Sequence, residues 1–204
     1  MTQNSDKRTR VIGITGGVGS GKSEVLKYLE EEYGALVLRT DDMAKDMIEP
    51  GGECYDEAVE LIGRDCLTED GSFDRAKVAV KVFADKDLLQ RYNAIIHPAV
   101  WRDMKAVSEA ERRRGTPLVF IESALIVPKK DNETFDELWY VYASEPVRRE
   151  RLKATRGYSD EKIDSIMANQ ISDDDFRTGC DVIIDNSGDL EDTKARIDRV
   201  LGEH

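Results

Sequence analysis

Apolar and polar positions along the chain follow two periodicities, one typical of buried strands and one typical of amphipathic helices. Short runs rich in β-branched and aromatic residues predict strands, and apolar residues at helical spacing predict helices between them. The expected strands are 10–15, 36–40, 117–122, 137–143 and 182–185. Strands that alternate with helices indicate an α/β fold, with a mostly parallel five-stranded sheet in three layers.

The expected helices are bounded by short capping signals. A helix is predicted over 23–33, where Gly34 is a suitable C-terminal cap, and a second is predicted over 41–48 behind an Asp cap. An Arg-rich helix follows from Glu145 to a break near Gly157. One further helix is expected before the last strand, and a closing helix is expected to end at about residue 201.

The middle of the chain, from Gly51 to about Gly115, is mostly helical and more polar, with turn signals at 69–71 and at His97-Pro98. No repeat, low-complexity tract or flexible linker in the sequence marks a boundary between independent domains. We therefore expect a single domain over 1–204. Its core comprises about 10–50 and 116–204, a helical substrate-binding insertion of about 51–115 covers the ligand crevice, and about 148–160 forms a lid.

Composition narrows the protein class. Of the 204 residues, 40% are hydrophobic and 35% charged, which is typical of a soluble globular protein with a core. The longest apolar stretch, around 117–128, is interrupted by Glu122 and is too short for a membrane helix. The first ten residues are polar and predict a short disordered lead-in rather than a secretory signal. Three widely spaced cysteines predict free thiols in a reducing cytoplasm; they are Cys54, Cys66 and Cys180.

The formal net charge of −12 argues against non-specific nucleic-acid binding, which needs an excess of Lys and Arg. An acidic protein that binds a polyphosphate must therefore concentrate positive charge locally.

Residues 16–23 read GGVGSGKS, which fits the phosphate-binding pattern G-x-x-x-x-G-K-[ST] between an expected strand and helix. Glycines let backbone N–H groups point inward around a phosphate, and the helix N-terminus adds partial positive charge. Lys22 is expected to reach the β- and γ-phosphates of ATP, and Ser23 to hold Mg²⁺. The Glu24 carboxylate is expected to turn toward solvent. The candidate nucleotide-binding residues here are Gly17, Val18, Gly19, Ser20, Gly21, Lys22, Ser23 and Glu24.

Two carboxylates are candidates for the chemistry of a kinase. Asp41 follows the second expected strand, and ligands of open α/β sheets bind just beyond the carboxyl ends of strands, so Asp41 is the candidate base. Asp42 is interpreted as a helix cap that faces water. Glu122 ends an apolar strand that resembles a Walker B strand and is a candidate Mg²⁺ ligand through water. The alternative is a carboxylate that only caps the strand or accepts hydrogen bonds.

Cations gather in the Arg-rich helix. Arg148 and Arg151 are three residues apart and share a helix face, whereas Arg149 points elsewhere. Arginines that close over the γ-phosphate can accelerate phosphoryl transfer by ~10³–10⁵, so Arg148, Arg151 and Arg156 are candidate nucleotide-binding residues, with Gly157 as a hinge. The alternative is an ordinary solvated basic face.

These residues resemble the dephospho-coenzyme A kinase family from Ile12 to the C-terminal helix. Its members transfer the γ-phosphoryl group of ATP to the ribose 3′-hydroxyl of dephospho-CoA, the last step of CoA synthesis. The matching segments are 13–23, Asp41, 43–45, Pro50-Gly51, Asp70-Gly71, Asp74-Arg75, Val82-Phe83, Ile96-His97-Pro98, 122–125, Phe135-Asp136, Arg151, Arg156, Gln170 and Asp185-Asn186.

The resemblance implies Asp41 as the base, and Lys22 with Arg151 as stabilisers of the migrating phosphoryl group. It also places Arg75 and His97 near the acceptor, with Asp41 and Glu122, although a His before Pro is otherwise a turn residue. Lid closure is expected to exclude water. The chain departs from the family pattern at Arg39, at Glu122 and over 124–128, which affects the expected substrate contacts.

Two other functions remain open from the sequence. A nucleoside or nucleotide monophosphate kinase needs further cations for a second phosphate, and only Arg39, Lys45 and Arg75 are available as candidates. A non-catalytic ATP-binding regulator is disfavoured by the presence of Asp41. The N-K-x-D tetrapeptide of GTPases is missing from the sequence. We also expect a cytoplasmic monomer or small homo-oligomer, with dephospho-CoA as its small-molecule partner and no nucleic-acid or membrane partner.

Overall fold

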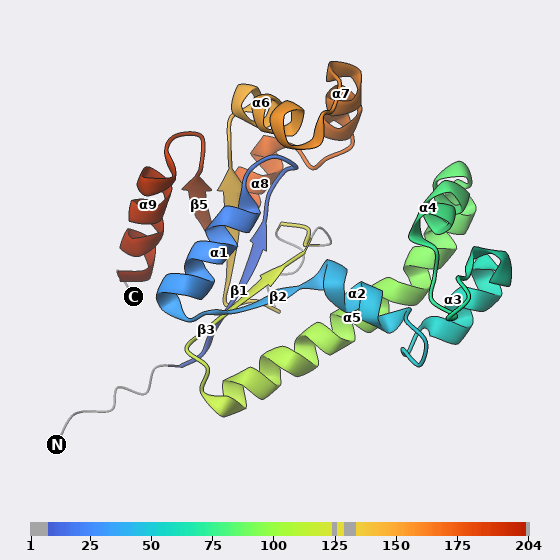
Figure 1. Ribbon diagram of the computed structural model, residues 1–204. Coiled ribbons are helices and arrows are strands. Elements are labelled where there is room, and N and C mark those ends of the chain that lie inside the picture. Colours follow the sequence, from blue (N-terminus) through green and yellow to red (C-terminus); the bar gives the residue numbers. More distant parts are fainter. Residues whose placement is uncertain (1–7, 124–125, 129–133, 203–204) are drawn as a thin grey trace. The chain divides into compact units, whose positions relative to one another are not determined.

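Five strands form a single sheet in the computed structural model, in the order β2-β3-β1-β4-β5 (Figure 1). The structure describes residues 8–123, 126–128 and 134–202. The strands are β1 Arg10–Thr15, β2 Leu36–Arg39, β3 Leu118–Glu122, β4 Glu137–Tyr142 and β5 Val182–Asp185. The pairs β1–β3, β1–β4 and β4–β5 are parallel. The predicted α/β fold is confirmed, and every expected strand lies within one residue of its observed bounds.

Helices connect the strands. They are α1 Lys22–Tyr33, α2 Thr40–Met47, α3 Tyr55–Ile62, α4 Arg75–Ala84, α5 Lys86–Arg114, α6 Glu145–Arg156, α7 Asp160–Ala168, α8 Asp173–Gly179 and α9 Leu190–Gly202, with a 3₁₀ turn η1 at Arg64–Cys66. The chain divides into two units. We call residues 8–38 and 111–202 the sheet unit, and Arg39–Ala110 the helical unit. Within the described residues, none of these helices combines the length and the apolar composition that a membrane crossing requires.

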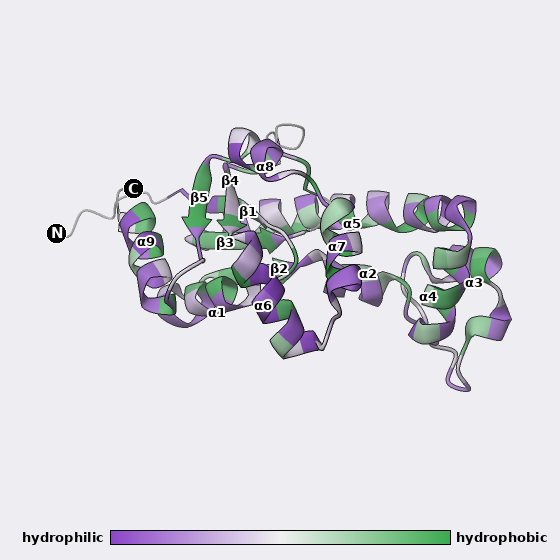
Figure 2. Ribbon diagram, turned by 90° about the horizontal axis from the view of Figure 1, so that it is seen from above, coloured by the Kyte–Doolittle hydropathy of each residue, from purple (hydrophilic) through white to green (hydrophobic). Residues whose placement is uncertain are grey.

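Helices cover both faces of the sheet. Trp139 and Val141 of β4 pack in one cluster with residues of α1 and α9. Tyr140, between them, stacks on Phe176 of α8 with ring centroids 4.6 Å apart. Because successive side chains of a strand point to opposite faces, α8 lies on the face opposite α1 and α9, which confirms the three layers. Figure 2 shows β5 in hydrophobic green and α6 largely in hydrophilic purple.

The predicted helix ends at glycines are confirmed. α1 ends at Gly34 and α6 at Gly157, and each glycine N–H donates to a carbonyl of the preceding turn. The prediction of one helix between Gly157 and β5 is wrong, because the chain forms α7 and α8 there. Ser172 separates them, since its hydroxyl accepts a hydrogen bond from the N–H of Asp175 and caps α8.

The turn predicted at His97-Pro98, in the helical unit, is wrong. These residues lie inside the 29-residue helix α5 rather than in a turn. Pro98 lacks an N–H and removes one hydrogen bond of the helix, but burial of its neighbours stabilises the helix on both sides of it. The buried neighbours are Ile96, Ala99 and Val100. The turn predicted at 69–71 is confirmed by a hydrogen bond from Gly71 N–H to Thr68 O.

The predicted Asp cap of the second helix is also wrong. α2 begins at Thr40 with Arg39 as its N-cap, so Asp41 and Asp42 both lie in its first turn, and no side chain caps this end. Acidic residues are favourable here because the helix dipole is positive at the N-terminus. The side chain of Asp42 is exposed and accepts a hydrogen bond from Lys45 Nζ (2.5 Å).

The three cysteines are unpaired, as predicted. Two are buried in the helical unit and one is half-buried next to β5; they are Cys54, Cys66 and Cys180. Two sequence-based expectations, the polar lead-in over 1–7 and the family departure at 124–125, fall outside the described residues.

Candidate functional site

The predicted phosphate-binding loop lies between β1 and α1. Its turn closes through a hydrogen bond from Ser20 N–H to Gly17 O (3.1 Å), and α1 begins at Lys22 with Gly21 as its N-cap. The first N–H groups of a helix have no acceptor within the helix, and the helix dipole places partial positive charge at this end. This end of α1 is therefore suited to an anionic phosphate group.

Two positions of the loop require glycine for different reasons. Gly21 has a φ of 86°, in the left-handed region that side chains disfavour, and a Cβ there would lie 2.2 Å from Nδ2 of Asn186. A Cβ on Gly17 would lie 2.5 Å from the guanidinium carbon of Arg148. The loop is thus shaped by side chains that approach its backbone from distant parts of the sequence.

Lys22 and Glu122 place opposite charges near the start of the loop. The ammonium of Lys22 donates to the carbonyl of Gly16 (2.7 Å). Glu122 ends β3 as the register partner of Ile14, close to the point where β1 leads into the loop. The side chain of Glu24 is exposed, as predicted.

The donor set suits Mg²⁺, although it does not form a dedicated metal cage. Ser23 offers a hydroxyl in the first turn of α1, and Glu122 offers a carboxylate. Among the described residues, no three His, Cys, Asp or Glu side chains gather in a way that could hold a metal ion. Mg²⁺ in kinases is bound by one or two protein oxygens together with phosphates and waters, and Ser23 with Glu122 is compatible with that arrangement.

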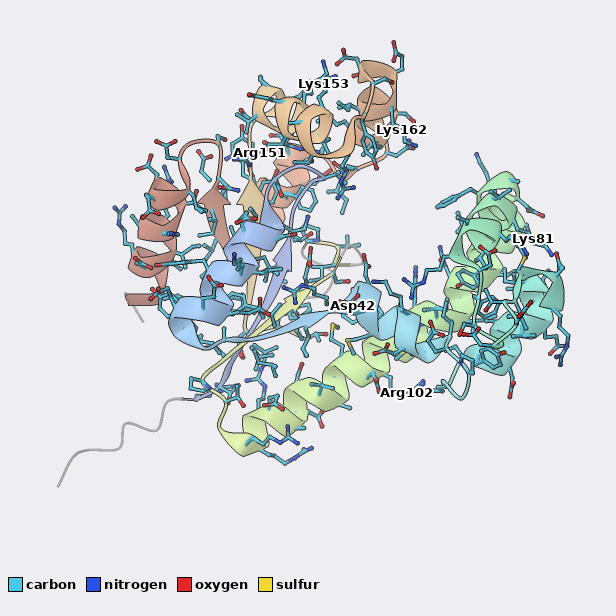
Figure 3. The ribbon with its side chains drawn as sticks, in the orientation of Figure 1. Asp42, Lys81, Arg102, Arg151, Lys153 and Lys162 are labelled. Carbon is cyan, nitrogen blue, oxygen red and sulfur yellow. The ribbon has the colours of Figure 1, made fainter. Side chains whose placement is uncertain are left out.

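Arg148 and Arg151 both reach the loop from α6, as their spacing predicts. Arg148 Nε donates to Val18 O (2.9 Å). Arg151 Nη1 donates to Ser20 O (3.3 Å), and its position on α6 can be followed in Figure 3. Neither residue is part of an ordinary solvated basic face, because both guanidinium groups bind loop carbonyls.

The neighbouring arginines point elsewhere. Arg149 forms ion pairs with Glu145 of its own helix and with Asp160 and Asp164 of α7. Arg156 is exposed, and its guanidinium carbon lies 5.9 Å from the ring centroid of Tyr158. The structure therefore brings two of the three predicted lid arginines to the phosphate-binding loop.

Asn186 is a site residue to which local sequence patterns gave no role. It is 3% exposed, and all four of its polar groups are hydrogen-bonded. Its side-chain Nδ2 donates to Ser20 O (2.8 Å), and its Oδ1 accepts from the hydroxyl of Thr193 (2.9 Å). Its backbone N–H donates to Tyr142 O (2.7 Å), and its carbonyl accepts from Arg151 Nη2 (2.9 Å). The residue thus fixes the loop to β4, α6 and α9 at once.

The remaining predicted site residues belong to the helical unit. Asp41 is exposed in the first turn of α2. Arg75 begins α4, and its Nη2 lies 3.6 Å from Oε1 of Glu49. His97 is half-buried in α5, and this burial lowers its pKa.

Comparison with known proteins identifies relatives over nearly the whole chain. A family model described as dephospho-CoA kinase matches residues 10–192. A dephospho-CoA kinase of Carboxydothermus hydrogenoformans is 34% identical over 192 residues, which are 94% of this chain and 92% of that protein. Another, of Thermobifida fusca, is 36% identical over 192 residues, or 94% of each chain.

Solved structures agree with this similarity. A crystal structure of a protein from Thermus thermophilus is 30% identical, with a TM-score of 0.76 over 97% of this chain and 98% of that one. A dephospho-CoA kinase from Campylobacter jejuni has a TM-score of 0.68 at 16% identity, over 96% and 97% of the two chains. The latter similarity shows the shared fold alone.

Replacing Gly21 by Ala should weaken MgATP binding by at least about tenfold, because the new Cβ is strained at positive φ and displaces Asn186. Gly34→Ala is the matched control, since Gly34 also has positive φ but nothing lies within 4 Å of a Cβ there. Titration calorimetry with MgATP checks this. Equal affinities in the two variants would contradict the role of the Asn186 contact.

His97 should make stability depend on pH. Burial lowers its folded pKa below the unfolded value of about 6.5, so the unfolded chain binds more protons between these two values. The free energy of unfolding should therefore fall as the pH drops below about 6.5, and His97→Gln should flatten this dependence. Urea denaturation at pH 7.5 and at pH 5.5 compares the two proteins. An unchanged pH dependence in the variant would contradict this account.

Proposed function

The chain belongs to the dephospho-CoA kinase family. We propose the following roles for its residues in the reaction of that family. The loop of the sheet unit binds the triphosphate of ATP, and Asp41 of the helical unit acts as the base toward the ribose 3′-hydroxyl of dephospho-CoA. The products are CoA and ADP. The observation that best supports this assignment is the loop between β1 and α1, which Asn186, Arg148 and Arg151 hold by hydrogen bonds to its carbonyls.

The transfer step needs one proton acceptor and compensation of negative charge. The acceptor oxygen attacks the γ-phosphorus while its proton moves to the Asp41 carboxylate, and the bond from that phosphorus to the β–γ bridging oxygen breaks. Lys22 and Arg148 supply positive charge next to the loop that holds the phosphates. Arg151 holds the loop through Ser20 O and Asn186 O, and its contact with the migrating phosphoryl group stays a prediction.

Mg²⁺ belongs to the same proposal. Ser23 and Glu122 would hold the ion together with phosphate oxygens. When bound, the ion neutralises charge on the β- and γ-phosphates. The nucleotide contact of Arg156 and the acceptor contacts of Arg75 and His97 stay predictions, as do the single-domain boundaries, the cytoplasmic location and the monomeric or small oligomeric state.

The family membership of the chain favours dephospho-CoA over a nucleoside or nucleotide monophosphate as the acceptor. The alternative requires cations for a second phosphate, and two of its three candidates lie beside carboxylates, with Lys45 paired with Asp42 and Arg75 near Glu49. Dephospho-CoA therefore remains the proposed acceptor.

Asp41→Asn should preserve MgATP binding and lower kcat by roughly 10²–10⁴, because it removes the base while keeping a side chain of similar size. Asp42→Asn is the matched control from the same helical turn, and its kcat should stay within about twofold of the wild type, as usual for an exposed surface position. The measurement is an assay coupled to ADP release, with dephospho-CoA as acceptor.

Two results of this experiment would overturn the proposal. An unchanged kcat in Asp41→Asn would remove this residue from the mechanism. Turnover with a nucleoside monophosphate but none with dephospho-CoA would replace the proposed acceptor.

A further inference from the structure

Gln170 lies between α7 and α8, and its side chain contacts the lid arginine that lies on the phosphate-binding loop. Its Oε1 accepts a hydrogen bond from Nη2 of Arg148 (2.5 Å), while Nε of the same arginine donates to Val18 O (2.9 Å). We propose that Gln170 is a positioning residue that orients Arg148 toward the γ-phosphate of ATP. This inference rests on the proposed function of the loop.

The two hydrogen bonds fix the plane of the guanidinium group. Nε and Nη2 form one edge of this planar group, and both acceptors bind that edge. Nη1 takes no part in either bond and is the donor that we assign to a phosphate oxygen. Val18 alone would hold Arg148 through one bond, about which the guanidinium plane could still turn. Gln170 supplies the second point of attachment.

The position of Arg148 indicates the γ-phosphate end of the loop. Its guanidinium lies against Gly17, so closely that a Cβ there would be 2.5 Å from it. Lys22 Nζ donates to Gly16 O (2.7 Å) and lies 3.5 Å from Gly17 O. The lysine of such loops reaches the β- and γ-phosphates. Because Arg148 and Lys22 both approach Gly17, we place Arg148 at the same end of the nucleotide.

Gln170 is well suited to this task because its neighbours are anchored. On one side, the neighbouring helices α6 and α7 are joined by the ion pair of Arg149 with Asp164 (Figure 1). On the other side, α8 is held to β4 by the stacking of Phe176 on Tyr140. The segment between α7 and α8 is thus attached at both ends, and Gln170 presents its amide oxygen from a supported position.

Arg148 and Arg149 differ in the charge of the groups that bind them, and Gln170 is a neutral partner. Arg149 pairs with three carboxylates, which neutralise its positive charge; they are Glu145, Asp160 and Asp164. Arg148 is instead held by an amide oxygen and a backbone carbonyl. Neutral acceptors fix a guanidinium without cancelling its charge, so the charge of Arg148 stays available to an anionic phosphate.

The first test compares MgATP with MgADP by titration calorimetry, which needs no acceptor. Gln170→Ala should weaken MgATP binding about tenfold, the size expected when a hydrogen bond to a charged group is lost, and MgADP binding less than about twofold. A merely structural role would weaken both nucleotides equally. Asn169→Ala is the matched control, because the exposed Asn169 amide donates to Ser165 O of the neighbouring helix α7. It should leave both affinities unchanged.

Two further variants make the test decisive. In an Arg148→Ala background, Gln170→Ala should have no further effect on MgATP binding, because the residue acts through Arg148. Gln170→Glu keeps a hydrogen-bond acceptor but adds a negative charge that neutralises Arg148. It should therefore weaken MgATP binding and leave the melting temperature unchanged.

Several results would overturn the inference. They are MgATP affinity within twofold of the wild type in Gln170→Ala, equal losses for MgATP and MgADP, an undiminished effect in the Arg148→Ala background, or wild-type MgATP affinity in Gln170→Glu. If Gln170→Ala does not fold, Gln170→Glu still decides between the outcomes. Wild-type turnover of dephospho-CoA, measured separately, tests the proposed function, so that failure of the acceptor assignment is distinguishable from failure of this inference.

Discussion

The carbonyl of Ser20 is the point at which the sheet unit fastens its phosphate-binding loop. It accepts hydrogen bonds from Asn186 Nδ2 and from Arg151 Nη1, so a buried amide and an arginine of α6 meet on one backbone atom. A buried polar network stabilises a structure only when every member is satisfied, and each polar group of Asn186 has a partner here. The shape of the loop, the position of α6 and the need for glycine at residue 21 all follow from this arrangement.

The loop keeps its positive charge because the cations beside it are held by neutral acceptors. The chain has a formal net charge of −12, so carboxylates are plentiful. Yet among the described residues Arg148 and Arg151 donate to backbone carbonyls and one amide oxygen, whereas Arg149 of the same helix is paired with carboxylates. An acidic protein can in this way keep a locally positive surface for a polyphosphate. The same reasoning explains why net charge alone is a poor guide to such a ligand.

The sequence predicted features that depend on local patterns. Buried β-branched runs located all five strands within one residue, and the glycine-rich motif located the loop, because strand periodicity and backbone freedom are properties of neighbouring residues. Pro98 was misread as part of a turn because packing of its buried neighbours outweighs the lost hydrogen bond. Ser172 divides two short helices that periodicity could not separate.

Contacts between residues that are far apart in the sequence could not be predicted from local patterns. Asn186 and Ser20 are 166 positions apart, and Arg148 and Gln170 are 22 apart. Nothing in the residues next to Asn186 or Gln170 signals a partner, and the family resemblance includes both residues without implying a role for either. The separate faces of Arg148 and Arg149 were predictable from helical spacing, but the carbonyls that receive Arg148 and Arg151 became visible only in the folded sheet unit.

The most direct test of this account is titration calorimetry with MgATP on the wild type and on Asn186→Ala. We expect saturable binding to one site in the wild type. The variant should bind MgATP with an affinity lower by about tenfold or more, because the Ser20 carbonyl loses its buried donor and the loop loses its fixed shape. Wild-type protein without saturable binding, or a variant with unchanged affinity, would contradict the central claim that a buried asparagine holds the loop ready for phosphate.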